Sequence, residues 1–124
     1  MLQSLDDSKR MLTLELDLLK LDNILEAEEF IQNLLKSNNT YRFTALVNNA
    51  GVMCFGEYEW QTRSQIEQQI QVNLLGTMRL TKELLPLIRQ SKARVINITS
   101  HCGLQALPAL CPYAASKVDG TIMV

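Results

Sequence analysis

The sequence lacks the features that mark several large classes of protein. Its longest basic run is the pair Lys9–Arg10 and its formal net charge is −1, whereas nucleic-acid binding needs a concentrated basic face. No apolar run approaches the roughly 18 residues that span a bilayer, and residues 1–20 alternate apolar and charged positions instead of forming a secretory core. We therefore expect no nucleic-acid partner, no membrane segment in this chain and a soluble, intracellular protein.

Cysteine and histidine are also scarce. The three cysteines, Cys54, Cys102 and Cys111, are an odd number and form no C-x-x-C pair, so they predict neither a disulfide framework nor a zinc site. The single histidine, His101, follows a serine, which invites comparison with serine hydrolases. Residues 99–103 read Thr-Ser-His-Cys-Gly, however, and lack the Gly-x-Ser-x-Gly elbow of that class. We expect no metal site and no hydrolytic triad.

The first half of the chain contains strand-like and helix-like patterns in turn. From Met11 to Leu18, leucines alternate with polar residues, which predicts a half-buried or edge strand. A helix should follow, because apolar residues recur there at three- and four-residue steps. Asn23 with Glu26 is a candidate cap for its start, and residues 37–39 should end it. Its apolar face carries Ala27, Phe30, Ile31, Leu34 and Leu35.

The second half continues the alternation. Residues 43–47 form a short apolar run with little polar content and predict a buried parallel strand. A long helix should then start at a capping box, formed either by Thr62 with Gln65 or by Ser64 with Glu67. Glycine at 76 and proline at 86 predict a bend or an early end of this helix. Residues 94–99 predict a second buried strand, and a last helix should begin near residue 113. The expected buried face of the long helix carries Ile66, Ile70, Leu74, Met78, Leu84, Leu85 and Ile88.

This order of strand, helix, strand, helix, strand and helix favours an α/β fold built on a parallel sheet. Ligands of such sheets gather at the carboxyl ends of the strands. Asp17 lies at the end of the first predicted strand, and residues 48–51 and Ser100 lie at the ends of the other two. An aspartate at a strand end, however, is often only a turn residue. Asn73 stands in the middle of a predicted helix, where an amide is mildly unfavourable; it is either a solvated helix residue or a functional one.

A serine, a tyrosine and a lysine near the end of the chain form the most informative pattern. Tyr113 follows Ser100 by thirteen residues, and Lys117 follows Tyr113 by four, which is one turn of a helix. A serine hydroxyl can hold a carbonyl oxygen, and a phenol can donate a proton. An ordinary phenol titrates near 10, so a neighbouring cation is needed for it to work near neutrality. The three residues therefore predict proton transfer to or from an alcohol oxygen.

Together with Asn-Asn-Ala-Gly at 48–51 and Asn73, this pattern resembles the short-chain dehydrogenase/reductase family. The surrounding residues resemble the branch that contains retinol, hydroxysteroid and D-3-hydroxybutyrate dehydrogenases. The resemblance runs from about Leu12 to the last residue and implies a Rossmann-type, doubly wound parallel sheet, of which residues 1–124 would form a single, incomplete NAD(P)-binding domain. The segments that carry the branch resemblance are residues 72–77, 85–89 and 94–100.

The resemblance implies a role for each residue. Tyr113 would be the general acid for ketone reduction or the base for alcohol oxidation. Lys117 would supply the cation and, with Tyr113, contact the nicotinamide ribose. Ser100 would orient the substrate oxygen, and Asn73 would help to hold a water-linked proton relay to Lys117. The remaining cofactor contacts, for NAD or NADP, would come from Asp17 and Leu18 at the adenine and from Asn49, Ala50 and Gly51 at the adenosine ribose.

The sequence departs from the family at both ends. The family opens with a glycine-rich turn that places the pyrophosphate at a helix N-terminus, but no glycine here precedes Gly51. We therefore expect a truncated chain of an oxidoreductase that interconverts a secondary alcohol and a ketone, plausibly a steroid or retinoid. The strand at 95–98 should present an exposed apolar edge. The alternative is a catalytically inactive truncated isoform or interaction module that cannot bind cofactor alone. The long helices, residues 62–88 and the tyrosine helix, are candidates for a homo-oligomer interface.

Overall fold

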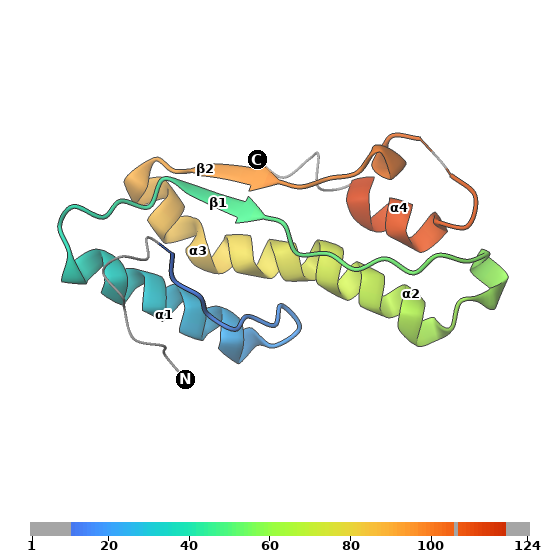
Figure 1. The fold of residues 1–124 in the computed structure, drawn as a ribbon, viewed down its shortest axis with the longest axis horizontal. Coiled ribbons are helices and arrows are strands. Elements are labelled where there is room, and N and C mark those ends of the chain that lie inside the picture. Colours follow the sequence, from blue (N-terminus) through green and yellow to red (C-terminus); the bar gives the residue numbers. More distant parts are fainter. Residues whose placement is uncertain (1–10, 106, 119–124) are drawn as a thin grey trace.

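The computed structural model describes residues 11–105 and 107–118. Its described elements place two parallel strands beside a long helical rod, with a further helix at each end of the molecule (Figure 1). Short 3₁₀ turns at Tyr58–Trp60 and His101–Gly103 connect the regular elements. In chain order, the helices and strands are α1 (Leu21–Ser37), β1 (Ala45–Asn48), α2 (Arg63–Ile70), the π-helical turn η2 (Gln71–Gly76), α3 (Thr77–Ser91), β2 (Arg94–Asn97) and α4 (Cys111–Val118).

Strands β1 and β2 form a parallel pair, as the sequence predicts. Their register runs from Ala45 opposite Arg94 to Asn48 opposite Asn97. The side chains of Leu46 and Val95 pack toward α1 and α3. The opposite face of the pair is exposed at Val47, Ile96 and Ile98. Among the described strands β2 pairs with β1 alone, and Ile96 and Ile98 are exposed, as expected of an apolar edge at residues 95–98.

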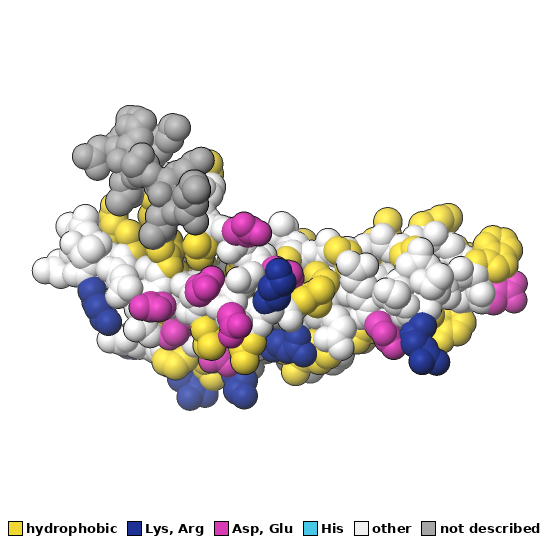
Figure 2. Space-filling view, turned by 90° about the horizontal axis from the view of Figure 1, so that it is seen from below, with side chains coloured by type: hydrophobic (Ala, Val, Ile, Leu, Met, Phe, Trp, Pro, Cys, Tyr) yellow, Lys and Arg dark blue, Asp and Glu magenta, His cyan; other side chains and the backbone are white. Residues whose placement is uncertain are grey.

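The hydrophobic core lies between α1, α3 and one face of the strands. Ile24 of α1 and Leu84 of α3 are almost completely buried at its centre. Phe43, Leu46 and Val95 pack against its margin. On the side of the molecule shown in Figure 2, acidic and basic side chains are interspersed and do not gather by sign. The buried members of the core are Leu18, Ile24, Leu80, Leu84, Leu87 and Ile88.

The prediction of a strand at Met11–Leu18 is wrong. The segment is irregular and ends in a turn, in which the amide of Lys20 donates to the carbonyl of Asp17 over 3.0 Å. Alternating leucines favour an extended chain, but a strand also needs a neighbour that supplies hydrogen-bond partners, and no described strand lies beside this segment. Its leucines are mostly exposed, and only Leu18 enters the core.

Helix α1 confirms the first predicted helix but not its predicted cap. The residue before the helix is Lys20, whose side chain makes no capping hydrogen bond. Asn23 and Glu26 both lie inside the helix, and their side chains approach each other at 3.5 Å. The cap prediction fails because the helix begins two residues before Asn23, as soon as the turn at Asp17 ends.

Helix α2 begins at the first of the two predicted capping boxes. The hydroxyl of Thr62 accepts the amide N–H of Gln65 at 3.3 Å, and the Gln65 side chain accepts the amide N–H of Thr62 at 2.8 Å. The rod then continues through η2 and α3 to Ser91, so of the two predicted alternatives, a bend or an early end, the early end is wrong. Pro86 is accommodated inside α3 because it lies on an exposed face, where water can solvate the carbonyl that loses its partner.

The buried face of the long rod also differs from the predicted one. Leu84 and Ile88 are buried as expected, whereas Met78 is exposed and Ile66, Ile70, Leu74 and Leu85 are only half-buried. In α2 and η2 the buried positions are Gln69, Asn73 and Gly76, none of which the prediction included. The prediction assumed that apolar side chains face inward, but this half of the rod packs on loops and on α4 through hydrogen bonds.

Gly76→Ala should lower the free energy of unfolding. A Cβ at Gly76 would lie 2.7 Å from the Cβ of Leu18, which is an atom close to the backbone that cannot rotate away. Alanine improves helix propensity by about 1 kcal/mol, but overpacking costs about 1–3 kcal/mol, so a net loss of about 1 kcal/mol is expected. Chemical denaturation measures it, with exposed Gln68→Ala as the control for helix propensity. Unchanged or increased stability would contradict the packing of Leu18 on Gly76.

Candidate active site

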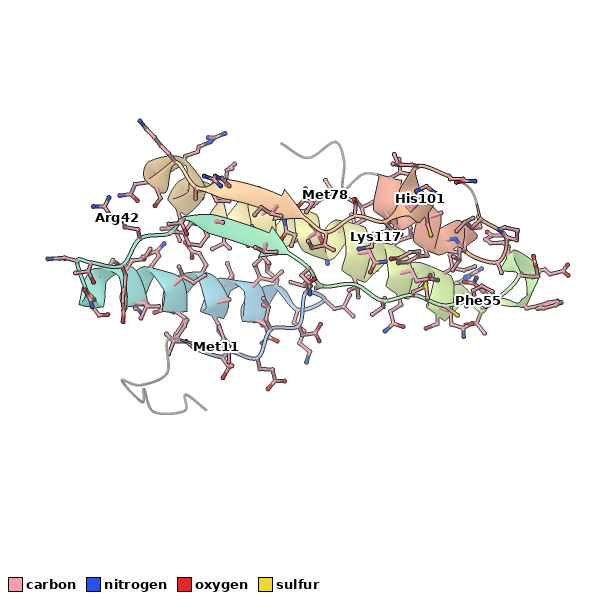
Figure 3. The ribbon with its side chains drawn as sticks, turned by 45° about the horizontal axis from the view of Figure 1, so that its top comes forward. Met11, Arg42, Phe55, Met78, His101 and Lys117 are labelled. Carbon is pink, nitrogen blue, oxygen red and sulfur yellow. The ribbon has the colours of Figure 1, made fainter. Side chains whose placement is uncertain are left out.

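Four segments meet beyond the carboxyl ends of the strands. They are the loop that follows β1, the turn η2, the segment after β2 that carries Ser100, and helix α4. Figure 3 shows Lys117 at this junction, and Arg42 at the opposite end of the sheet. The arrangement follows from parallel strands, whose carboxyl ends share one edge of a sheet.

Asn73 joins two of these segments through its side-chain amide. Its Oδ1 accepts the amide N–H of Val52 at 2.7 Å, and its Nδ2 donates to the carbonyl of Val52 at 2.8 Å. The same Nδ2 donates to Ser116 Oγ in α4 at 2.9 Å. Asn73 lies in the π-helical turn, a feature found mainly at functional sites. Its backbone carbonyl accepts the hydroxyl of Thr77 at 2.9 Å.

Lys117 is the buried cation of the site. Its side chain crosses from α4 to the carbonyl of Ile98, to which Nζ donates at 3.0 Å, and only 8 % of the residue is exposed. Nζ lies 5.8 Å from the centroid of the Tyr113 ring. Burial penalises the charged amine and lowers the pKa of Lys117 from its ordinary 10.5. The structure thus brings the ammonium and the phenol ring together.

Gly51 lets the backbone of the loop after β1 come close to both polar side chains. A Cβ at this position would lie 3.3 Å from Lys117 Nζ and 3.4 Å from Asn73 Oδ1. The last residue of the Asn-Asn-Ala-Gly motif therefore faces the lysine and the asparagine that the sequence pairs with it. A larger residue would have to displace one of these two groups.

Ser100 is half-buried and starts the 3₁₀ turn His101–Gly103. Its Oγ accepts the amide N–H of Cys102 at 3.3 Å, which leaves the hydroxyl hydrogen able to donate. The turn packs tightly on the end of α4, because a Cβ at Gly103 would lie 2.8 Å from the Lys117 carbonyl oxygen. His101 is exposed and its Nε2 contacts Gln105 Oε1 at 2.8 Å.

The predicted adenosine residues lie on the side of η2 toward α1. Leu18, Asn49 and Ala50 line a small cavity of about 130 Å³. The carboxylate of Asp17 is engaged in its own turn, where Oδ1 accepts the amide N–H of Leu19 at 3.0 Å and Oδ2 lies 3.6 Å from Lys20 Nζ. The structure therefore brings three of the five residues to one cavity, whereas Gly51 faces Lys117 and Asn73 and Asp17 makes a local turn contact.

Two buried amide clusters were not found by the sequence reasoning. Gln69 is 1 % exposed; its Oε1 accepts the amide N–H of Cys54, and its Nε2 donates to Gln61 Oε1, each at 3.1 Å. It fastens the loop after β1 to α2. The available signal was the spacing of Gln69, Asn73 and Thr77 four residues apart, which places three polar side chains on one face.

The second cluster lies beneath the ends of the strands. Asn48 Nδ2 donates to Asn97 Oδ1 at 2.8 Å and to Thr81 Oγ1 at 3.0 Å. Asn48 and Asn97 are paired across the two strands, so the cluster ties both strand ends to α3. The repeated asparagine at the end of each apolar run was its signal in the sequence.

Within residues 11–105 and 107–118, no three His, Cys, Asp or Glu side chains are grouped so as to hold a metal ion. None of the described helices combines the length and apolar character needed to cross a membrane.

The chain belongs to the short-chain dehydrogenase family, because the sequence model of that family matches residues 1–123. It is 40% identical over 110 residues to mitochondrial D-beta-hydroxybutyrate dehydrogenase from Mus musculus, which covers 89% of this chain and 32% of the relative. It is 33% identical over 116 residues to 17-beta-hydroxysteroid dehydrogenase type 2 from Homo sapiens, covering 93% of this chain and 29% of that relative. The chain spans about a third of the length of these curated relatives.

Further comparisons agree on family and fold. Retinol dehydrogenase 7 from Mus musculus is 34% identical over 100 residues, covering 81% of this chain and 31% of the relative. The crystal structure of an alcohol dehydrogenase from the archaeon Thermococcus sibiricus, complexed with 5-hydroxy-NADP, superimposes with a TM-score of 0.73 at 25% identity. That superposition covers 86% of this chain and 43% of the other chain. The resemblance to the family and the α/β fold are confirmed.

The buried amine makes the stability of the protein depend on pH. Because the pKa of Lys117 is lower in the folded chain than its ordinary 10.5, folding penalises the charged form at neutral pH. The penalty fades as the pH rises from the lowered pKa to 10.5. The free energy of unfolding of the wild type should therefore rise relative to Lys117→Met across that window, and the difference should stay constant below it.

Denaturation at a series of pH values from neutral to alkaline measures this difference. Lys82→Met, which removes an exposed amine of α3, is the matched control. A stability difference between wild type and Lys117→Met that does not change with pH would show that Lys117 is not desolvated.

Proposed function

We propose that this chain carries the proton-transfer residues of an NAD(P)-dependent oxidoreductase that interconverts a secondary alcohol and a ketone. The supporting observation is the placement of a buried ammonium, that of Lys117, between the Tyr113 ring, the Asn73 amide and Gly51. Membership of the short-chain dehydrogenase family supports the reaction class.

In this proposal Tyr113 moves the proton and Lys117 makes that transfer favourable. A nicotinamide held by these residues would supply the hydride for reduction. The Tyr113 hydroxyl donates its proton to the carbonyl oxygen, and the positive charge of Lys117 stabilises the phenolate that remains. The Ser100 hydroxyl donates a hydrogen bond to the same substrate oxygen and orients it. Oxidation of the alcohol runs through the same contacts in reverse.

The residues present fit a dinucleotide at both of its ends. At the adenosine end, the cavity lined by Leu18, Asn49 and Ala50 offers an apolar surface next to backbone groups. At the nicotinamide end, Lys117 and Tyr113 would hold the ribose. We assign Asp17 a supporting role, since its carboxylate holds the turn that delivers Leu18. The calorimetry with each cofactor, described below, distinguishes NAD from NADP.

The names of the relatives support a substrate class for this proposal. Those matched are named for hydroxybutyrate, retinol and 17-beta-hydroxysteroid, which are all substrates with an alcohol or its carbonyl form. Exposed apolar residues on the two loops beside the site, Met53, Phe55 and Leu104, favour a lipid such as a steroid or retinoid. These loops are joined by a hydrogen bond from the Gly56 amide N–H to the Ala109 carbonyl at 3.0 Å.

A second candidate is a non-catalytic interaction module. The exposed apolar face of the strands at Val47, Ile96 and Ile98 favours it, because such a face is an association surface. The half-buried apolar residues Ile66 and Ile70 on α2 give a further contact surface for a homo-oligomer. Under this candidate the buried lysine is inherited from the family and no longer used.

Tyr113→Phe should abolish turnover while leaving the fold intact. Proton transfer by a positioned side chain contributes about 10²–10⁴-fold to rate, so oxidation of NADH or NADPH with a panel of ketones should fall by at least about a hundredfold. Isothermal calorimetry with each cofactor should show similar binding for wild type and variant. Tyr41→Phe, an exposed tyrosine at the opposite end of β1, is the matched control.

The outcomes separate the two candidates. Turnover that survives in Tyr113→Phe at the level of Tyr41→Phe would contradict the proposed role of Tyr113. A wild type that binds neither cofactor and turns over no ketone would instead favour the interaction module.

A further inference from the structure

Ser116 is the link between the turn that carries Asn73 and the helix that carries Tyr113 and Lys117. Its side chain is 2 % exposed. Its Oγ accepts Asn73 Nδ2 at 2.9 Å and donates to the backbone carbonyl of Tyr113 at 2.7 Å. One hydroxyl therefore contacts both the amide from η2 and the backbone of the tyrosine itself.

We propose that Ser116 is a positioning residue, which fixes α4 against the amide of Asn73 and thereby sets where Tyr113 and Lys117 lie. Its kinetic consequence rests on the proposed function, but its structural consequence does not. Ser116 touches no reacting atom; it acts through Tyr113, which precedes it by three residues in α4, and through Lys117, which follows it.

The geometry of Asn73 explains why this single bond matters. Asn73 has one acceptor oxygen and two donor hydrogens on its amide. The oxygen and one hydrogen serve the backbone of Val52, and the other hydrogen serves Ser116. The hydrogen bonds with Val52 therefore fix the orientation of the Asn73 amide. The hydrogen bond to Ser116 then fixes the position of α4 relative to that amide. Both side chains are buried, so water cannot readily replace the bond.

The position of Lys117 depends in part on the hydrogen bond between Asn73 and Ser116. Its Nζ is tied to the carbonyl of Ile98 and lies against Gly51, which precedes Val52 in the chain. If α4 loses its bond to Asn73, the ammonium is no longer pressed against the loop and water can reach it. Helix propensity gives no reason for a buried serine here, since alanine is the better helix former.

The test follows Lys117 directly, in the full chain. We would measure its pKa from the ¹³Cε shift of labelled lysine, assigning the resonance by its loss in Lys117→Met. In Ser116→Ala the pKa should rise toward 10.5, because the amine becomes better solvated. Thr81→Val is the matched control: it also removes a hydroxyl that accepts from a buried asparagine, but at the strand ends, and it should leave the Lys117 pKa unchanged.

Two further variants keep the proposal falsifiable if Ser116→Ala folds poorly. Ser116→Thr retains the hydroxyl and should keep the wild-type pKa of Lys117. Asn73→Ala should raise the pKa as Ser116→Ala does, and the double variant should add nothing, because both changes remove the same bond. A Lys117 pKa that stays at the wild-type value in Ser116→Ala or Asn73→Ala, or additive effects in the double variant, would overturn the proposal.

The kinetic measurement separates this proposal from the proposed function. If the chain turns over a ketone, Ser116→Ala should lower kcat by about tenfold to a hundredfold with little change in KM, because misplacement of a reacting group by about 1 Å costs on that order. Ser116→Thr should restore kcat. Should the wild type show no turnover, the proposed function fails and the Lys117 titration alone decides the role of Ser116.

Discussion

The amide of Asn73 is the constraint on which the site depends. It holds the loop after β1 through both backbone groups of Val52, and it holds α4 through Ser116. These segments are 21 and 43 residues away from it along the chain. The π-helical turn supplies the local geometry, and the Thr77 hydroxyl binds the Asn73 carbonyl from the next helical turn. Among the described side-chain hydrogen bonds, only those of the Asn73 amide join η2 to both partners.

This arrangement divides the molecule into two halves that are stabilised by different forces. Around α1 and α3 the buried side chains are apolar, and Ile24 and Leu84 form a conventional core. In α2, η2 and α4 the buried side chains are mostly polar: Gln69, Asn73, Ser116 and Lys117, with Pro112 as the apolar exception. A buried amide stabilises only if its hydrogen bonds are made. The half that carries the site therefore depends on directional contacts, which fix positions sharply but tolerate little displacement.

Much of the fold could be predicted from the sequence, because most of its signals were local. The apolar runs gave β1 and β2, the Thr62–Gln65 pair gave the start of α2, and spacing brought Tyr113 and Lys117 onto one face of α4. The strand predicted at Met11–Leu18 failed because a strand is a pairwise structure and alternation describes one partner only. The buried face of α2 was missed because periodicity rules assign apolar residues to the interior, whereas here the interior is polar.

The division into an apolar half and a hydrogen-bonded half affects how easily α4 can separate locally from the rest of the molecule. An element that is held by a few hydrogen bonds can separate locally without exposing the apolar core. Helix α4 has eight residues, too few to be stable by itself, and its buried positions include Ser116 and Lys117. Its order must therefore come from its partners: Asn73 at one side, Ile98 beneath and Gly103 at its end. Tyr113 and Lys117 belong to this helix. The positions of the phenol and the ammonium are therefore only as well defined as those three contacts.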